Sequence, residues 1–190
     1  FQSNGILILG AMGVPMQRWG NEYLFAVPAD VFACKDGHLY LGILLDSHWQ
    51  TLARLMGQPD LADDANYVVL TNRLQRREEI NELVAHWIAA YTVDEVVTLL
   101  VQAGLSVAPV RSPAQAAKDP HILARDMLQD TPQLDGSSAP IVGPAAKFSR
   151  TPTRVRTGAP ALGAHDAEIL KELGLSAQEI DALREKKIIV

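Results

Sequence analysis

The pattern of hydrophobic and polar residues predicts a β-hairpin early in the chain. Residues 31–34 and 38–44 are rich in strand-forming side chains, and the Asp36-Gly37 pair between them favours a tight turn. A further apolar run, LSVAPVR at 105–111, is typical of a buried strand. Shorter strand-like pieces, APIVG and AKFS, occur within 128–158. The chain should therefore contain a small antiparallel sheet.

Helical spacing dominates the remainder of the chain. The expected helices are 46–56, 72–91, 92–104, two short turns on either side of Asp119-Pro120, and a last helix opened by Ser176. The helix at 72–91 has a core-facing stripe at the helical period, formed by Ile80, Val84, Trp87, Ile88 and Tyr91. Thr92 and Ser176 each begin a capping box, with a glutamate three residues later. Asp46 or Ser47 is the expected cap of the first helix, and Gly57 its end. A small sheet surrounded by helices makes the fold class α+β.

Composition and charge exclude several classes of protein. The net charge of −5 argues against a nucleic-acid partner, because phosphates attract basic surfaces. Cys34 is the single cysteine, so an internal disulfide is impossible and a reducing cytoplasm is the expected location. No apolar run approaches the ~20 residues that span a membrane as a helix. We therefore expect a cytoplasmic protein with neither a nucleic-acid nor a membrane partner.

Common motifs of metal sites, phosphate loops and hydrolases do not occur in the sequence. Metal-ligand spacing is absent among the five histidines, which are His38, His48, His86, His121 and His165. The glycines at 10 and 13 lack the flanking strand and the further glycines of a phosphate loop. A G-x-S-x-G nucleophile motif is also missing. We expect no metal site.

Two short stretches have the character of a binding site. Arg18, Gly20 and Asn21, with Trp19 among them, lie in a loop over 12–30 that contains two prolines and two glycines. Glycine permits close approach of the backbone to a ligand, tryptophan offers a stacking face, and arginine offers an anion-binding fork. Asp46 and His48 stand where a strand passes into a helix, a usual place for ligand-facing side chains. The alternatives are a purely structural loop, and a helix cap beside a solvated histidine.

Two further features have both a functional and a structural interpretation. Arg73, Arg76 and Arg77 lie near the start of a predicted helix, where cations oppose the helix dipole. They either bind an anion such as phosphate or pair with the acidic run Asp60–Asp64, and we favour the pairing. His165 lies in or just before the first turn of a helix, where we expect it to cap the helix rather than act as a base.

The first residues indicate that the chain continues a longer one. The apolar run GILILGAMG at 5–13 starts without a methionine or a helix cap, and such a run usually follows something upstream. The preceding FQSN is either native or the remnant of a cleavable tag. We therefore expect that part of the natural protein precedes Phe1.

Several stretches match one family in order along the chain. They are VPMQRWGNEYLFAVPADVFACKDGHLYL, LLDSHWQTLARLMGQPDLADD, TNRLQRREEINELV, AGLSVAPVRSPAQAAKDPHILARDM, and the run from 142 to 189. In these stretches the chain resembles the family III CoA-transferases, a group that includes formyl-CoA transferases, carnitine CoA-transferases and α-methylacyl-CoA racemases. The match includes a P-x-R-x-G-N-like loop, an Asp-Gly hairpin and a D-P-x-x-x-A-R-x-M run.

The resemblance implies how the chain is organised. Members of the family carry an N-terminal Rossmann-like domain that holds the catalytic aspartate. Residues 1–28 would be the linker from that domain, 29–130 a small α+β domain, and 131–190 a loop-rich arm whose short helices return to pack on it. His165 would then be a structural residue of the arm. In the family, two chains interlock as linked rings, which implies a homodimer.

The resemblance also implies an activity. The protein would be an acyl-CoA:carboxylate CoA-transferase that moves CoA between a thioester and a small carboxylic acid, through an aspartyl intermediate on the missing half. Coenzyme A thioester is then a substrate, no cofactor is bound covalently, and this chain supplies no catalytic residue. Arg18, Gly20, Asn21, Asp46 and His48 would face the substrate. The alternatives are an α-methylacyl-CoA racemase and, for the isolated chain, a non-catalytic lid or dimerisation module.

Overall fold

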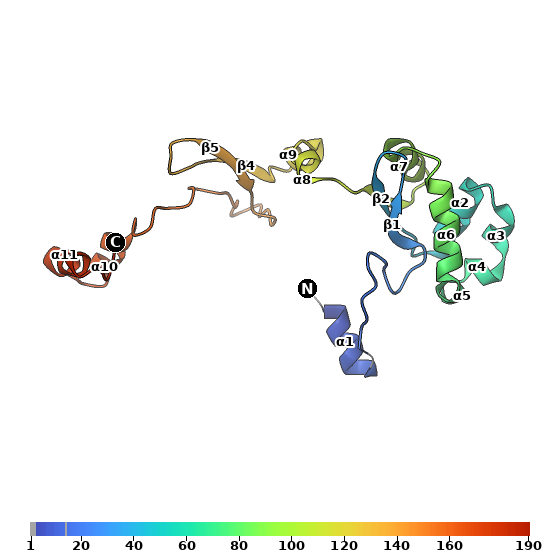
Figure 1. The fold of residues 1–190 in the computed structure, drawn as a ribbon, viewed down its shortest axis with the longest axis horizontal. Helices are drawn as coiled ribbons and strands as arrows, with labels where there is room; N and C mark the ends of the chain where they lie inside the picture. The colour runs from blue at the N-terminus through green and yellow to red at the C-terminus, as the bar shows by residue number, and fades with distance from the viewer. Residues whose placement is uncertain (1–2, 14) are drawn as a thin grey trace. The chain divides into compact units, whose positions relative to one another are not determined.

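The computed structural model describes residues 3–13 and 15–190. The backbone separates into two compact units, Phe1–Val110 and Arg111–Val190, coloured from blue to green and from yellow to red in Figure 1. The expected division into 1–28, 29–130 and 131–190 rests on the family resemblance and stays a prediction. Phe1 and Gln2, which bear on the question of a tag, lie outside the described residues.

The first unit combines a three-stranded sheet with short helices. Its elements are α1 (Ser3–Met12), β1 (Ala29–Ala33), β2 (His38–Gly42), α2 (Asp46–Leu55), α3 (Pro59–Asp63), α4 (Ala65–Val68), α5 (Leu70–Gln75), α6 (Arg77–Ile88), α7 (Val93–Gln102) and β3 (Ser106–Pro109). The strands are antiparallel neighbours in the order β1-β2-β3. This arrangement confirms the α+β fold class.

The strands follow the predicted pattern except in the burial of the last one. The β1–β2 hairpin forms around the Asp-Gly turn, and in β2 the buried Leu39 and Leu41 alternate with the exposed His38 and Tyr40. The run at 105–111 does form a strand, β3, but alternate residues of β3 are exposed. The prediction that this strand is buried is wrong, because β3 pairs with β2 alone and lies at the edge of the sheet.

Three helices form a hydrophobic core with the sheet. Their buried side chains lie on one face of each helix, at three- and four-residue spacing: Trp49, Leu52 and Ala53 of α2, Ile80, Val84 and Ile88 of α6, and Val96 and Leu100 of α7. In Figure 1 α6 lies beside β1, and α7 contacts β2 and β3. Just after α2, Gly57 turns the chain with a φ of +73°, a value that favours glycine.

The predicted helix at 72–91 is interrupted. α5 ends at Gln75 and α6 begins at Arg77, because the backbone of Arg76 lies outside the helical region, with φ −110° and ψ 25°. α6 then ends at Ile88, before Tyr91, and both Trp87 and Tyr91 of the predicted stripe are only partly buried. Here the structure corrects the sequence prediction: two helices replace the single one, and the buried residues of the stripe all lie in α6.

The local capping signals have different outcomes. The Thr92 box is confirmed, since its hydroxyl accepts from the Glu95 backbone N–H and the Glu95 carboxylate accepts from the Thr92 N–H at 2.8 Å. The Ser176 box is confirmed in the same way. The prediction that Asp46 or Ser47 caps the first helix is wrong, because Leu45 occupies the capping position and Asp46 is already the first helical residue.

The second unit consists of short elements joined by long loops. They are α8 (Pro113–Ala116), α9 (Pro120–Ala124), β4 (Leu128–Pro132), β5 (Ser138–Val142), α10 (Asp166–Glu172) and α11 (Ala177–Glu185). β4 and β5 form an antiparallel hairpin, and α8 and α9 separate at Asp119 as predicted. The strand-like piece AKFS is not a strand.

His165 precedes α10, but its side chain makes no capping hydrogen bond and lies exposed, 3.7 Å from Glu168. The prediction that it caps the helix is therefore wrong.

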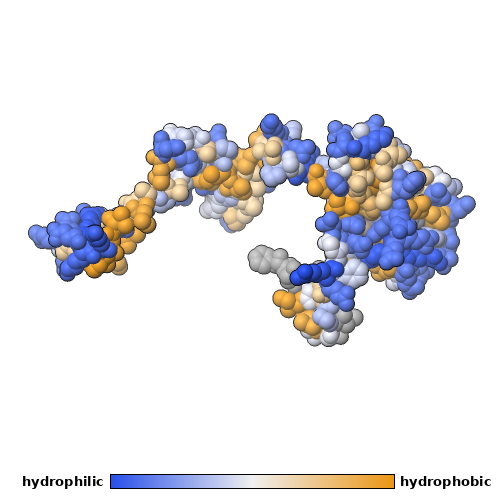
Figure 2. All heavy atoms as spheres, viewed as in Figure 1, coloured by the Kyte–Doolittle hydropathy of each residue, from blue (hydrophilic) through white to orange (hydrophobic). Residues whose placement is uncertain are grey.

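Little of the second unit is buried within itself. Among residues 111–190, all of which the structure describes, Ile180 is the one buried hydrophobic side chain. An apolar groove of about 390 Å³ lies between α8, α9 and the β4–β5 hairpin. Figure 2 shows hydrophobic residues, in orange, at the surface of this unit. The most exposed of them are Leu134, Val142, Leu162 and Leu173.

Among the described residues, no single helix is long and apolar enough to cross a bilayer. Only α6 and α7 taken as a pair reach that length and composition, and they are bent by 114° relative to one another. Both contribute buried side chains to the core of the first unit.

Candidate functional site

A hollow lies in the loop between α1 and β1, and we call it the loop hollow. It measures about 500 Å³ and is lined by residues 16–20 and 22–25. Arg18, Trp19 and Gly20 therefore belong to its wall, whereas Asn21 is exposed beside it. Gly20 has a φ of +63°, a conformation that favours glycine. The structure thus groups an arginine, a partly exposed indole and a flexible backbone position around one hollow.

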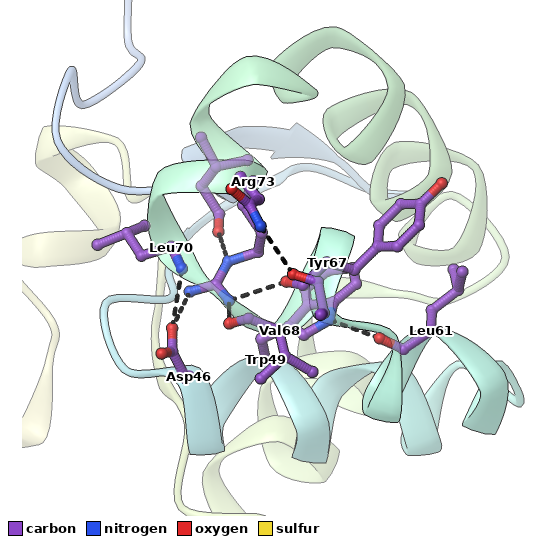
Figure 3. Close-up of polar contacts among 10 residues, drawn as sticks. Asp46, Trp49, Leu61, Tyr67, Val68, Leu70 and Arg73 are labelled. Atoms are coloured by element: carbon purple, nitrogen blue, oxygen red, sulfur yellow. Dashed lines mark hydrogen bonds and ion pairs between the residues drawn. The ribbon is translucent and has the colours of Figure 1, made fainter.

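Asp46 and His48, the second predicted group, lie in the first turn of α2. Oδ1 of Asp46 accepts hydrogen bonds from Arg73 Nη2 and from the Leu70 backbone N–H, both at 3.1 Å (Figure 3). In the described part of the chain no hydrogen bond reaches Oδ2, and 49% of the side chain is exposed. Asp46 therefore has one oxygen held in place and one directed to its surroundings.

His48 has a polar atom that needs a partner. The residue is partly buried, and its Nδ1 is shielded from solvent with no hydrogen-bond partner among the described residues. Buried polar atoms in folded proteins are nearly always hydrogen-bonded, so an isolated one marks a position of interest. Among the described residues, no hydrogen bond or ion pair joins Asp46 or His48 directly to Arg18, Gly20 or Asn21.

Arg73 connects the two regions. Its side chain is fully buried, its Nε donates to the Val27 carbonyl at 3.0 Å, and Nη1 donates to the carbonyls of Tyr67, at 2.9 Å, and Val68. Burial lowers the pKa of the Arg73 guanidinium, and the Asp46 carboxylate acts in the opposite direction. Figure 3 shows how one guanidinium ties the end of the loop, α4 and the start of α2 together.

The basic cluster does not pair with the acidic run Asp60–Asp64. Arg73 bonds Asp46, Arg76 pairs with Glu79 at 3.1 Å, and Arg77 pairs with Glu22 at 3.2 Å. Within the acidic run, Asp63 pairs with Arg54 and Asp64 caps α4. The predicted pairing is therefore wrong, because the break at residue 76 turns the three arginines toward different partners. Two of them are also too enclosed to bind a phosphate, since Arg73 is fully buried and the side chain of Arg77 is only 12% exposed.

The Glu79 carboxylate accepts hydrogen bonds from two side chains, those of Tyr67 and Arg76. The Tyr67 hydroxyl donates to Oε1 at 2.5 Å, and Arg76 donates to Oε2 at 3.1 Å. The tyrosine hydrogen bond, followed by that of the arginine, holds the pKa of Glu79 below its usual value. Conversely, the Glu79 hydrogen bond raises the pKa of Tyr67.

This arrangement predicts how stability responds to acid. A carboxylate with a depressed pKa stabilises the fold above its ordinary pKa and loses that contribution as pH falls through the lower, folded-state pKa. Glu79→Gln should therefore weaken the loss of stability below about pH 4.3. The effect should be at most about 1 kcal/mol, because the pair is exposed to solvent. Urea unfolding between pH 6 and 3 measures it, with Glu82→Gln on the same helix as the control. Identical pH dependence in the wild type and Glu79→Gln would contradict the prediction.

Comparison with known proteins decides the family. The model of CoA-transferase family III matches residues 3–166. The chain belongs to this family. The matched residues of this family III chain include the loop hollow, Asp46, His48 and the buried Arg73.

Named relatives of the family III chain are enzymes of CoA transfer. An acyl-CoA transferase of Fusarium pseudograminearum is 34% identical over 94% of this chain and 40% of its own length. A succinyl-CoA:mesaconate CoA-transferase of Haloarcula hispanica is 36% identical over 83% of this chain and 39% of its own length. The alpha subunit of a succinyl-CoA–L-malate CoA-transferase of Chloroflexus aurantiacus is 32% identical over 95% of this chain and 42% of its own length. The chain thus spans about two fifths of these relatives.

A solved structure shares the fold. A CAIB/BAIF family protein from Brucella suis superimposes with a TM-score of 0.70 at 23% sequence identity, over 90% of this chain and 44% of the Brucella protein. At that level of identity the likeness shows the fold alone. It agrees with the α+β arrangement of the family III chain.

Several polar residues of this region escape prediction from sequence. Glu22 meets Arg77 and Asn81 across separations of 55 and 59 residues, and Tyr67 meets Glu79 across two helix boundaries. A single sequence holds no periodic signal for contacts of this range.

Among the described residues, no cluster of three or more His, Cys, Asp or Glu side chains could hold a metal ion.

Proposed function

We propose that this chain is part of an acyl-CoA:carboxylate CoA-transferase that takes CoA from succinyl-CoA and passes it to a small dicarboxylic acid. The observation that carries the proposal is the 36% identity to a succinyl-CoA:mesaconate CoA-transferase over 83% of the chain. Further support comes from the relative named for succinyl-CoA and L-malate. The racemase alternative has no such named relative among the enzymes compared above.

The reaction fits a carboxylate nucleophile supplied by another part of the protein. An aspartate carboxylate attacks the thioester carbonyl and expels the CoA thiolate, which leaves a mixed anhydride. The thiolate then attacks the aspartyl carbonyl and releases succinate, which leaves an aspartyl-CoA thioester. The acceptor carboxylate runs the same steps in reverse, so that the new acyl-CoA leaves and the aspartate is regenerated. We place this aspartate in an N-terminal domain that precedes the linker at 1–28.

The loop hollow has the chemistry to receive a carboxylic acid. Arg18 offers a planar guanidinium that suits bidentate binding of a carboxylate, and the Gly20 backbone leaves room for close approach. With Asn21, these residues are the proposed contacts to the acid. Asp46 and His48 are proposed to face the acyl-CoA, where the Oδ2 of Asp46 and the unpartnered Nδ1 of His48 remain to be satisfied.

The test uses the protein encoded by the complete reading frame that contains this chain. It is incubated with succinyl-CoA and, in separate reactions, mesaconate, L-malate or glutarate, and the new CoA thioester and free succinate are measured by mass spectrometry. We expect equimolar release of succinate and formation of the new thioester. Absence of exchange with every acid, together with epimerisation of an α-methylacyl-CoA, would assign the protein to the racemases instead.

The role of Arg18 gives a sharper prediction. Arg18→Gln should raise the KM for the acceptor acid about tenfold or more, because a hydrogen bond to a charged group contributes about 1.5–3 kcal/mol. Arg54→Gln, which removes an exposed arginine of α2, is the matched control and should leave that KM unchanged. An unchanged KM in Arg18→Gln would remove Arg18 from the proposed site.

The proposed placement of the nucleophile outside this chain can be tested separately. The 190-residue chain alone should show no turnover with any of these substrates, since the proposed nucleophile is elsewhere. Measurable CoA exchange by the isolated chain would overturn that placement. Light scattering of the complete protein checks the proposed homodimer.

A further inference from the structure

One side chain, Arg77, holds the irregular loop that forms the loop hollow. Its Nη2 donates to the Leu24 carbonyl at 2.7 Å, and its Nη1 lies within hydrogen-bond distance of the carbonyls of Tyr23, at 3.2 Å, and Ala26, at 3.4 Å. The same Nη1 donates to the Glu22 carboxylate at 3.2 Å. One guanidinium therefore meets three backbone carbonyls and one carboxylate within residues 22–26.

The contacts of Arg77 extend to the wall of the loop hollow. Its guanidinium carbon lies 5.5 Å from the centre of the Trp19 ring, within the range of a cation–π contact. Glu22 receives a second hydrogen bond from Asn81 of α6, at 3.2 Å. Arg77 and Asn81 are four residues apart and so face the loop from the same side of α6. The start of α6 thus acts as a clamp for the loop.

Little else holds this segment in place. Residues 19–26 make few main-chain hydrogen bonds, which run from Glu22 to Trp19, from Tyr23 to Ala29 and from Ala26 to Tyr23, the last at 3.4 Å. The aromatic rings of the segment are partly exposed rather than packed in the core. Because the segment has no strand ladder and Ala26, at its end, is its one fully buried side chain, the conformation of the loop depends on the guanidinium.

We propose that Arg77 is a positioning residue for CoA transfer, which fixes the loop so that Arg18, Gly20 and Asn21 meet the acceptor acid in one arrangement. This inference rests on the proposed function. Arginine suits the task because its planar fork can serve several carbonyls at once, whereas a lysine ammonium is a single point of charge. The neighbouring Arg76 forms an exposed surface pair with Glu79, and among the described residues no hydrogen bond or ion pair joins it to the loop.

The contrast between these neighbours gives the experiment. In the complete protein, Arg77→Ala should lower kcat about 10- to 100-fold, because a displacement of about 1 Å in a positioning group can cost about 100-fold. Arg77→Lys should recover only part of this loss. Added guanidinium should restore part of kcat in Arg77→Ala and none in the wild type. Arg76→Ala is the matched control and should retain kcat within about twofold, since it is an exposed pair.

Hydrogen exchange separates positioning from loss of the fold. In Arg77→Ala we expect faster exchange of the amides of 19–26, with the amides of α2 and α7 unchanged. Equal acceleration throughout the first unit, without rescue by guanidinium, would overturn the proposal, as would an unchanged kcat. If the wild type itself transferred no CoA, the proposed function would fail. The role of Arg77 in holding the loop would then be tested by hydrogen exchange alone: faster exchange of the amides of 19–26 in Arg77→Ala would support it, and unchanged exchange would contradict it.

Discussion

Replacing Arg73 with methionine should lower the free energy of unfolding by about 3–5 kcal/mol. The side chain is fully buried, and its loss leaves the carbonyls of Val27, Tyr67 and Val68 without their donor. Each buried acceptor that loses its partner costs about 1–3 kcal/mol. Asp46, at the other end of the network, is half exposed, so water can replace the arginine there. Urea unfolding of the 190-residue chain at pH 7 measures the change.

The control for Arg73 is another arginine that bonds an aspartate. Arg54 donates to Asp63 at 2.8 Å, but both side chains are exposed by more than half. Arg54→Met should therefore change the unfolding free energy by at most about 1 kcal/mol. A similar loss in both variants would show that the burial of Arg73 contributes nothing beyond an ordinary surface ion pair.

Replacing Trp49 with alanine should have an effect of similar size, about 3–5 kcal/mol, because it empties the largest buried site of α2. The ring is fully buried and stacks near Tyr67, with 6.3 Å between the ring centres and 15° between the ring planes. Its Nε1–H donates to the Leu61 carbonyl at 2.9 Å, which ties α2 to α3. Thermal and urea unfolding both report this loss.

A second substitution at Trp49 separates packing from hydrogen bonding. Trp49→Phe keeps most of the apolar volume but leaves the Leu61 carbonyl without its donor. This variant should lose about 1–3 kcal/mol, which is less than the alanine variant. Equal losses in the two variants would mean that packing of the indole adds nothing to the hydrogen bond.

The sequence predicts features whose determinants are close together along the chain. The capping boxes at Thr92 and Ser176 form as expected because four neighbouring residues contain both halves of the interaction. The β1–β2 hairpin forms for a similar reason, since its turn and both strands are contiguous. The buried faces of α2, α6 and α7 follow from periodicity.

Features that depend on residues far apart along the chain cannot be predicted from local sequence patterns. The break at Arg76 is not predicted, because the hydrophobic stripe of Ile80, Val84 and Ile88 lies entirely in α6 and holds no signal for a break before it. Asp46 has a residue type that suits a helix cap, yet it bonds Arg73 from 27 residues away. The three arginines likewise resemble an anion site until their partners are known. For the candidate site, the sequence indicates which loop is involved, whereas the network that holds it requires coordinates.

The sparse interior of residues 111–190 has a consequence for the life of the protein in a cell. With Ile180 as its one buried hydrophobic side chain, this unit opens at little free-energy cost unless another surface covers it. Cleavage by cellular proteases follows the population of opened states. Degradation should therefore begin in this part of the polypeptide, and substitutions that weaken its coverage should reduce the abundance of the protein before they alter its chemistry.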